Sequence, residues 1–238
     1  MSGEQLPFFS IIVPAHNEER CLGDTLTKLE ATTYPKDRYE VLVIENGSSD
    51  RTAEVAKLHE SPTCKVFSYT QKGVSFARNR GVEQASSTAD WVIFLDADSF
   101  FLPSYLGELA DYMKSLHTEC GVGGNVVRPF PDSSHARAWF RFYDGVHHVF
   151  GQAIHAIIVR SDLARATHFN EKQAWMEDVQ YVRHLKTKSK FFFFKTQSFF
   201  TSTRRNEHDG WWSLLFWEVF VGVLPSKLQA LFEYSAVR

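Results

Sequence analysis

Two aspartates separated by one residue, Asp96 and Asp98, directly follow the apolar run at residues 91–95. Alternate residues of an extended chain point the same way, so both carboxylates can address one cation. A hard divalent ion such as Mg²⁺ is held by one or two carboxylates and completes its shell with water and phosphate oxygens. Such an ion can neutralise a departing diphosphate. The alternative interpretation of the pair is a solvated acidic turn.

Polar loops also follow three earlier apolar runs. Residues 14–18 read Pro-Ala-His-Asn-Glu, residues 45–50 read Glu-Asn-Gly-Ser-Ser-Asp, and residues 71–81 carry a lysine, glycines and arginines. A loop of this kind that leads into a helix offers backbone N–H groups and short side chains to a nucleotide. Each loop taken alone could instead cap the helix that follows it. Four such loops at one edge indicate a binding site.

The residues between these loops predict strands that alternate with helices. Apolar runs predict strands at residues 8–14, 39–44, 65–69 and 91–95, and helices are predicted at 17–29, 52–59 and 74–85. This alternation indicates an α/β fold with a mostly parallel, Rossmann-like sheet that is covered by helices on both faces. Ligands bind at the carboxyl ends of the strands in such sheets, so the chemistry is expected just after each strand.

The second half of the chain has a looser pattern. Helices are predicted at residues 104–116 and 177–186, and strands at 121–127, 154–159 and 191–194. Residues 128–150 mix proline, arginine and aromatic residues, and no element is assigned to them. A smaller subregion with less regular structure is therefore expected beside the parallel sheet.

Five segments taken together resemble the family-2 glycosyltransferases, which have the GT-A fold. These segments are residues 9–18, 43–52, 73–81, Asp96-Ala97-Asp98 and Met176-Glu177-Asp178, in the family's order and spacing. The resemblance implies a single GT-A domain at residues 1–205. Its nucleotide-sugar half would span about 1–100 and its acceptor half about 101–205. The implied activity is inverting transfer of a sugar from a nucleotide-diphosphate donor to an acceptor hydroxyl, with metal-assisted departure of the nucleoside diphosphate.

A later segment, residues 201–212, resembles the Ser-x-Arg-Arg…Gly-Trp stretch of some soluble bacterial members. Its Arg204 is suited to bidentate contact with a diphosphate. Its His208 is a candidate third metal ligand, because imidazole is an acceptable though softer donor. A salt-bridged surface loop and a histidine at a helix entry are the alternative interpretations of these two residues.

The resemblance assigns a role to each site residue. The residues expected to bind the nucleotide sugar are Pro14, Ala15, Asn17, Glu18, Glu45, Asn46, Lys72, Gly73, Arg78, Asp96, Ala97 and Arg204. Asp98, and less directly Asp96, would hold Mg²⁺ or Mn²⁺. Asp178 would take the proton from the acceptor hydroxyl, and Glu177 would orient the acceptor or the helix start. Without the resemblance, these last two residues would be interpreted as an acidic first helical turn.

One of the five segments departs from the family pattern. The usual pair of aspartates after the second strand is Glu45-Asn46 in this chain. Asparagine offers a donor as well as an acceptor, whereas aspartate only accepts. The identity of the nucleotide base therefore stays open, as do the sugar, the acceptor and the linkage.

Residues 206–238 form a predicted C-terminal helical extension that is rich in aromatic residues. Its apolar stretch at residues 211–224 would span roughly 21 Å as a helix, which is short of a bilayer about 30 Å thick. Packing on the domain, a homodimer contact and peripheral contact with a membrane surface are the alternatives. The partners expected from the whole sequence are a nucleotide-sugar donor and a glycan or lipid-linked acceptor, as in the synthesis of bacterial cell-envelope polysaccharides or glycolipids.

Composition narrows the class of protein. The net charge of −2 argues against broad nucleic-acid binding. Three widely spaced cysteines and the lack of a secretion signal suit a cytoplasmic protein, soluble or peripheral at the inner face of the cell membrane. A dinucleotide dehydrogenase would need GxGxxG in its first turn. A sugar-1-phosphate nucleotidyltransferase would need a glycine-rich loop with arginine there. A non-catalytic sugar-binding relative and transfer to a polyprenyl phosphate stay open.

Overall fold

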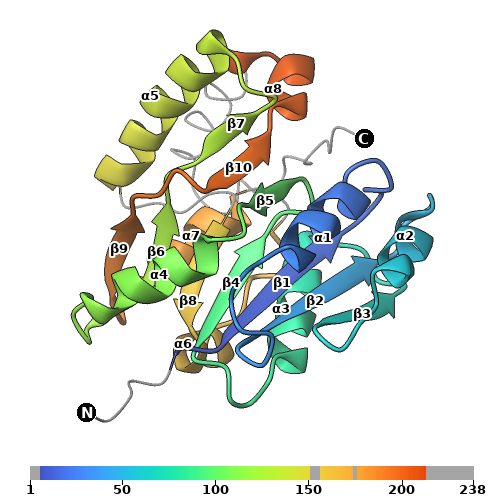
Figure 1. Ribbon diagram of the computed structural model, residues 1–238, viewed down its shortest axis with the longest axis horizontal. Coiled ribbons are helices and arrows are strands. Elements are labelled where there is room, and N and C mark those ends of the chain that lie inside the picture. Colours follow the sequence, from blue (N-terminus) through green and yellow to red (C-terminus); the bar gives the residue numbers. More distant parts are fainter. Residues whose placement is uncertain (1–5, 151–155, 174–175, 213–238) are drawn as a thin grey trace.

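The structure is a computed structural model that describes residues 6–150, 156–173 and 176–212 of the 238. Its main sheet has seven strands in the order β3-β2-β1-β4-β8-β6-β9 (Figure 1). The strands are β1 Phe9–Ala15, β2 Tyr39–Asn46, β3 Cys64–Tyr69, β4 Trp91–Leu95, β6 Cys120–Asn125, β8 Ala156–Arg160 and β9 Lys190–Phe194. Only β8 runs antiparallel to its two neighbours. The predicted mostly parallel sheet is confirmed.

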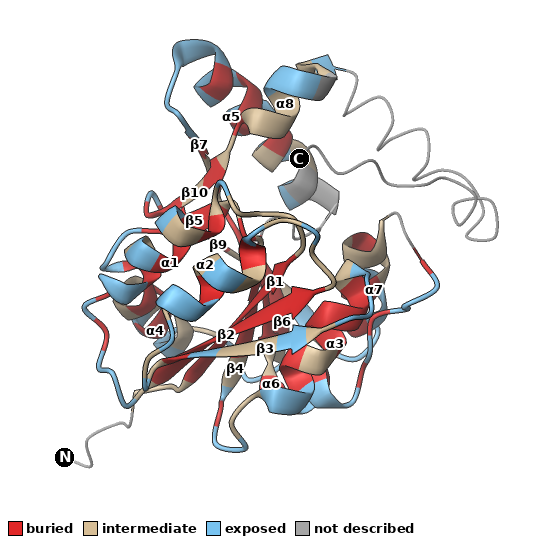
Figure 2. Ribbon diagram, turned by 90° about the vertical axis from the view of Figure 1, so that its right-hand side faces the viewer, coloured by how far each residue is buried: buried red, intermediate tan, exposed pale blue. Residues whose placement is uncertain are grey.

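Helices cover both faces of this sheet. One face carries α1 Leu22–Glu30, α2 Thr52–Leu58 and α4 Tyr105–Lys114, and the other carries α3 Val74–Gln84, α6 Ser161–Arg165 and α7 Glu177–Leu185. Two further helices, α5 Ser134–Phe150 and α8 Arg204–Asp209, lie in the upper part of the molecule (Figure 1). Alternate residues of β1 point to opposite faces, so Ile11 and Val13 pack with α1 and α4 whereas Ile12 packs with α3, α6 and α7. Figure 2 shows the buried core running through the sheet between these layers.

A glycine sets the distance between α3 and the sheet. A side-chain Cβ at Gly81 would lie 2.3 Å from the Cγ2 atom of Ile12, which is closer than two carbon atoms can approach. Because glycine has no Cβ, the backbone of α3 packs directly on β1. The amino end of α3, which carries residues of the third motif, is thereby held against the edge where β1 ends.

A second, smaller sheet lies above the carboxyl ends of β1 and β4 (Figure 1). It consists of β5 Ser99–Phe101, β10 Phe199–Ser202 and β7 Arg128–Phe130, in that order. The sequence did not predict these strands, because three or four residues are too few to show a period of two. This sheet joins the residue after Asp98 to the residues before Arg204.

The long helix α5 was also not predicted. Its buried residues are Ala136, Trp139, Phe140 and Tyr143, which have the i, i+3, i+4, i+7 spacing of a helix face. Aromatic residues and histidine are weak helix formers, and they masked this spacing. α5 packs beside β7 and completes the upper part of the molecule together with α8 (Figure 1).

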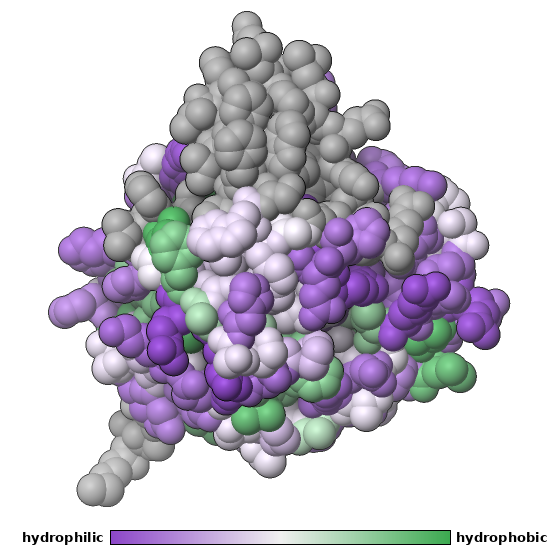
Figure 3. All heavy atoms as spheres, turned by 90° about the horizontal axis from the view of Figure 1, so that it is seen from above, coloured by the Kyte–Doolittle hydropathy of each residue, from purple (hydrophilic) through white to green (hydrophobic). Residues whose placement is uncertain are grey.

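The surface is mainly polar. Seen from above, hydrophilic residues dominate the described surface and apolar residues form separate small patches (Figure 3). Within the described ranges, no helix is long and apolar enough to cross a membrane. Apart from Trp211 and Trp212, the apolar stretch predicted at 211–224 lies outside the described residues. The three cysteines are free, and only Cys64 is fully buried.

Candidate active site

Hydrogen bonds tie the loop after β1 to the loop after β2. The backbone N–H of Asn17 donates to Ser48 Oγ at 3.1 Å, and Asn17 Oδ1 accepts from the N–H of Ser49 at 2.7 Å. Asn17 adopts a left-handed conformation with φ of 56°, which asparagine tolerates better than most residues. The buried Glu45 closes its own turn by accepting from the N–H of Ser48 at 2.7 Å. The first two predicted nucleotide loops therefore form one unit.

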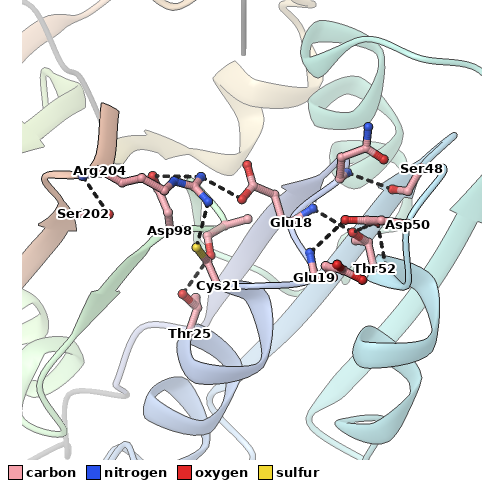
Figure 4. Close-up of polar contacts among 12 residues, drawn as sticks. Glu18, Glu19, Cys21, Thr25, Ser48, Asp50, Thr52, Asp98, Ser202 and Arg204 are labelled. Carbon is pink, nitrogen blue, oxygen red and sulfur yellow. Dashed lines mark hydrogen bonds and ion pairs between the residues drawn. The ribbon is translucent and has the colours of Figure 1, made fainter. Parts of the chain in front are cut away.

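Two further contacts hold the start of α1 against the start of α2. The N–H of Glu18 donates to Thr52 Oγ1 at 2.7 Å, and the N–H of Glu19 donates to Asp50 Oδ2 at 3.2 Å (Figure 4). These bonds use backbone N–H groups of Glu18 and Glu19, and the two carboxylates make other contacts. Glu19 Oε2 accepts from Arg51 Nε at 3.2 Å. The side chain of Glu18 then points toward Arg204 (Figure 4).

Arg204, the first residue of α8, gathers three groups around its guanidinium. It donates to Glu18 Oε2 at 3.0 Å and to Cys21 Sγ at 3.1 Å, and it lies 3.9 Å from Asp98 Oδ2 (Figure 4). Removal from water raises the pKa of Glu18, and the charge of Arg204 opposes that rise. The sequence did not point to Cys21 as part of this site.

The acidic turn between β4 and β5 is anchored through its backbone. Thr25 Oγ1 of α1 donates to the carbonyl of Ala97 at 2.8 Å, and the N–H of Ser202 donates to the carbonyl of Asp98 at 3.1 Å. Burial, followed by the negative charges of Asp96 and Glu18, raises the pKa of Asp98 to about 7, and the charge of Arg204 opposes the rise. A bound cation would lower that pKa, because its positive charge stabilises the carboxylate.

Arg78 of α3 links the acidic turn to α7. It donates to Asp96 Oδ1 at 3.2 Å and to Glu177 Oε1 at 2.8 Å. Its side chain is only 8% exposed, and the guanidinium lies 5.2 Å from the centre of the Phe169 ring. The resemblance placed this arginine beside the base and diphosphate, whereas in the structure its contacts are with these two carboxylates and this ring.

Asp178 lies in the first turn of α7. Burial is the largest cause that raises its pKa to about 7, followed by the negative charge of Glu177, while the charge of Arg78 opposes the rise. Its Oδ1 atom accepts from the N–H of Val179 at 2.7 Å. The negative charge of Asp96 also raises the pKa of Asp178, so the two carboxylates interact electrostatically. A carboxyl group that titrates near neutrality suits a general base.

The remaining predicted residues lie at the same edge of the sheet and differ in how far they are buried. Pro14 and Ala15 end β1 and are buried, and Asn46 ends β2 and is buried. Lys72 and Gly73 are exposed in the loop before α3. Gly73 has φ of 125°, a conformation that favours glycine. The sequence therefore identified loops that converge, although these residues differ widely in accessibility.

The donor atoms of Asp96 and Asp98 fit a hard divalent cation, because carboxylate oxygens are the ligands that Mg²⁺ and Mn²⁺ prefer. His208 lies in α8 and is exposed. Among the residues that the structure describes, no three His, Cys, Asp or Glu side chains are arranged to hold a metal ion. The described part of the chain therefore offers two carboxylates rather than a complete set of ligands.

Comparisons with known proteins bear on the family and the fold. A sequence model of glycosyl transferase family 2 matches residues 10–212. Glycosyltransferase AglE of Haloferax volcanii is 34% identical over 134 residues, which are 55% of this chain and 43% of that protein. The poly(ribitol-phosphate) β-N-acetylglucosaminyltransferase TarS of Staphylococcus aureus is 25% identical over 126 residues, which are 50% of this chain and 22% of TarS. The matched regions span less than half of each of these relatives.

Solved structures show the same fold at lower identity. The crystal structure of TarS residues 1–349 with UDP-GlcNAc has a TM-score of 0.71 and 18% identity, over 93% of this chain and 69% of that one. The mannosyltransferase PcManGT of Pyrobaculum calidifontis, in complex with GDP-Man and Mn²⁺, has a TM-score of 0.66 and 19% identity, over 83% and 57%. The described fold is thus the GT-A-like fold that the sequence predicted, and the chain belongs to glycosyl transferase family 2.

Proposed function

We propose that this chain is an inverting glycosyltransferase that moves a sugar from a nucleotide-diphosphate donor to an acceptor hydroxyl, with Asp178 as the base. The observation that carries the proposal is the double contact of Arg78. Its guanidinium bonds to Asp96 at 3.2 Å and to Glu177 at 2.8 Å. Asp178, the neighbour of Glu177, is thereby held beside the acidic turn that belongs to the diphosphate end of the donor.

The reaction needs one proton transfer and one displacement. The acceptor hydroxyl gives its proton to the Asp178 carboxylate while its oxygen forms a bond to the anomeric carbon of the donor sugar. The bond from that carbon to the diphosphate oxygen breaks, and the diphosphate leaves with the electron pair. The transition state resembles an oxocarbenium ion, as in glycoside hydrolysis. A base whose pKa is about 7 is well matched to this transfer at neutral pH.

The diphosphate end of the donor is assigned to Arg204 and the acidic turn. The side chain of Arg204 is 27% exposed, so its guanidinium can donate hydrogen bonds to a diphosphate instead of to Glu18. A divalent ion held by Asp98 and Asp96 would neutralise the charge that develops on the departing diphosphate. His208 is retained as a candidate additional ligand. The loops after β1 and β2, together with Lys72 and Gly73, are assigned to the nucleoside.

The acceptor is assigned to the upper part of the molecule, over α5 and the smaller sheet. The relative TarS is named for transfer to poly(ribitol-phosphate), a polymer of hydroxyl-bearing repeats. We infer an acceptor of the same general kind, which is a hydroxyl of a cell-envelope glycan or of a lipid-linked glycan. The partner proposed for residues 206–238, of which the structure describes 206–212, is a second copy of the chain or a membrane surface.

Two measurements test the proposal. In a thermal-shift screen, one nucleoside diphosphate is expected to raise the melting temperature in the presence of Mg²⁺ or Mn²⁺, because a ligand of the folded state stabilises it. Asp178→Asn is then expected to keep that shift but to lower the rate of nucleoside diphosphate release by about 10²- to 10⁴-fold. Asp162→Asn, an exposed carboxyl on α6, serves as the matched control and should change neither quantity.

Distinct results would contradict separate parts of the proposal. If no nucleoside diphosphate raised the melting temperature with either metal, the assignment of the donor would be wrong. If Asp178→Asn turned over as fast as the wild type, Asp178 would not be the base. Binding of a nucleotide sugar without any turnover by the wild type, across a panel of glycan acceptors, would favour a non-catalytic binding protein.

A further inference from the structure

Asn79 of α3 makes a closed set of hydrogen bonds with a distant segment. Its Nδ2 atom donates to the carbonyl of Phe169 at 3.0 Å, and its Oδ1 atom accepts from the N–H of Phe169 at 2.9 Å. The same Nδ2 group also donates to Glu171 Oε1 at 2.9 Å. Asn79 is 3% exposed. The side-chain amide of Asn79 thus bonds to both the N–H and the C=O of Phe169, as the backbone of a neighbouring strand would.

Phe169, which Asn79 holds through its backbone, is packed against the helix of Asp178. Its ring stacks on Tyr181 with 3.7 Å between ring centres and 13° between ring planes. Phe94 of β4 meets both rings edge-on, at 5.1 Å and 5.8 Å between centres. Tyr181 follows Asp178 by three residues in α7, so the two side chains lie one turn apart on neighbouring positions of the helix surface.

The residue beside Asn79 holds α7 at a second point. Arg78 donates to Glu177 at 2.8 Å, and its guanidinium lies over the same Phe169 ring at 5.2 Å. Arg78 therefore fixes α7 directly at its first residue, Glu177. The next residue of α3, Asn79, fixes it through Phe169 one turn later. Asp178 lies between these two points of support.

We propose that Asn79 is a positioning residue for the base, which acts through Phe169 and Tyr181 to set the place of Asp178. This inference rests on the proposed role of Asp178. Only a side chain with both a donor and an acceptor can satisfy both polar groups of Phe169, and among short side chains the asparagine amide does so with a fixed planar geometry. A shift of a reacting group by 1 Å costs about 100-fold in rate. The donor loops after β1 and β2 lie outside this chain of contacts.

The first test compares two asparagine-to-alanine variants in the full-length chain. Asn79→Ala is expected to lower kcat by roughly 10- to 100-fold while the donor KM and the Kd of the nucleoside diphosphate change less than about twofold. Asn170→Ala is the matched control, because Asn170 is exposed in the same segment and its Oδ1 accepts a local hydrogen bond from the N–H of Lys172. The control should leave kcat unchanged.

Limited digestion with trypsin provides a local readout. Lys172 is exposed in the segment that Asn79 holds. Loss of the three hydrogen bonds should speed cleavage after Lys172, measured by mass spectrometry against cleavage after Lys114 as the internal reference. Equal acceleration at both lysines would mean that the whole fold, rather than this segment, has loosened.

A pair of conservative variants tests the contact itself. Asn79→Asp keeps the acceptor for the N–H of Phe169 but loses the donor and brings a carboxylate against Glu171. Adding Glu171→Gln supplies a donor opposite that carboxylate and removes the repulsion. The kcat of the double variant should therefore be at least about threefold higher than the kcat of Asn79→Asp, because substitutions at contacting residues are not additive. A general loss of stability would show no such recovery.

The outcomes separate this inference from the function on which it rests. A kcat for Asn79→Ala within twofold of the wild type, or a loss of kcat matched by an equal loss of nucleotide affinity, would overturn the positioning role. If Asn79→Ala does not fold, failure of Glu171→Gln to improve the kcat of Asn79→Asp overturns it instead. Full activity of Asp178→Asn would remove the base itself, whatever the result at Asn79.

Discussion

The two aspartates of the acidic turn are each paired with a different arginine, and the two arginines differ in burial. Asp96 is 35% exposed and Asp98 is 23% exposed, but Arg78 also bonds to Glu177, which is 14% exposed. Arg78 pairs with Asp96 from the middle of α3, and its side chain is 8% exposed. Arg204 pairs with Asp98 from the first residue of a short helix, and its side chain is 27% exposed. A buried ion pair fixes structure, because separating its members leaves a charge without water. A half-exposed arginine can change partners, so Arg204 is the one suited to binding a ligand.

Replacement of the buried arginine should give the largest effect on stability. Arg78→Met keeps much of the volume but leaves the carboxylates of Asp96 and Glu177 without their cation. The free energy of unfolding is expected to fall by about 3–5 kcal/mol, the usual result of breaking a buried pair. Urea denaturation measures it. A denaturation midpoint equal to that of the wild type would mean that the two arginines do not differ in the way described.

The raised pKa of Asp178 predicts that both kcat/KM and stability depend on pH. Its pKa is raised to about 7, and the group must be ionised to accept a proton, so kcat/KM should fall about tenfold for each pH unit below 7. The sign for stability is opposite. Since the folded state holds this proton more tightly than the unfolded chain, the stability gained is present below the ordinary pKa of 3.8 and is lost as the pH rises through 7.

The variant Asp178→Asn checks this sign. It removes the titration, so its stability relative to the wild type should be greater at pH 8 than at pH 5. Thermal or urea unfolding of both proteins at the two pH values gives the comparison. A relative stability that is independent of pH would show that Asp178 has an ordinary pKa, and the expected fall of kcat/KM would then move to lower pH.

Replacement of the half-exposed arginine should affect binding more than stability. Arg204→Met is expected to weaken binding of the nucleoside diphosphate about tenfold, as expected for loss of a hydrogen bond from a charged group. The free energy of unfolding should change by no more than about 1 kcal/mol. Calorimetric titration and urea denaturation measure the two quantities. Arg205→Met, at the next residue, is the control, and an equal loss of affinity there would remove the special role of Arg204.

An exposed pair away from the site completes the series. Lys114 bonds to Asp111 at 2.6 Å near the end of α4, and these side chains are 47% and 74% exposed. Lys114→Ala should change the free energy of unfolding by less than about 0.5 kcal/mol and leave nucleotide binding unaltered. A larger effect would show that exposure does not rank the energies of the ion pairs compared in this series.

Much of the fold could be predicted from the spacing of apolar residues along short stretches of the sequence. The helix predicted at residues 17–29 contains most of α1, and its leucines at helical spacing, Leu22, Leu26 and Leu29, are all buried. The apolar runs predicted each strand from β1 to β4 within two residues. The convergence of the polar loops was also predictable, because the carboxyl ends of neighbouring parallel strands lie at one edge of a sheet.

The contacts within the site were less predictable. Arg78 and Glu177 are separated by 99 positions, and Arg204 and Glu18 by 186. The periodicity of nearby residues does not indicate which charged residues make contact across such separations in the sequence. The role of Asn79 was hidden for the same reason, since its partner Phe169 lies in a segment without regular structure. Thr25 and Ser202 bond to backbone carbonyls of the acidic turn, Thr25 through its hydroxyl and Ser202 through its backbone N–H. Contacts to a backbone carbonyl leave little signature in the sequence.

The smaller sheet has a consequence for the order of events during synthesis. Ser99 bonds to Thr201 at 2.9 Å across 102 positions, so the acidic turn receives its last support only after nearly the whole described chain has left the ribosome. Contacts that close long loops form late, because the entropy of the intervening chain must be lost first. A nascent chain that ends before residue 199 can build β1 to β4 but has neither β10 nor Arg204. The predicted site therefore stays incomplete until residue 204 has been synthesised, and a product truncated before residue 199 lacks part of it.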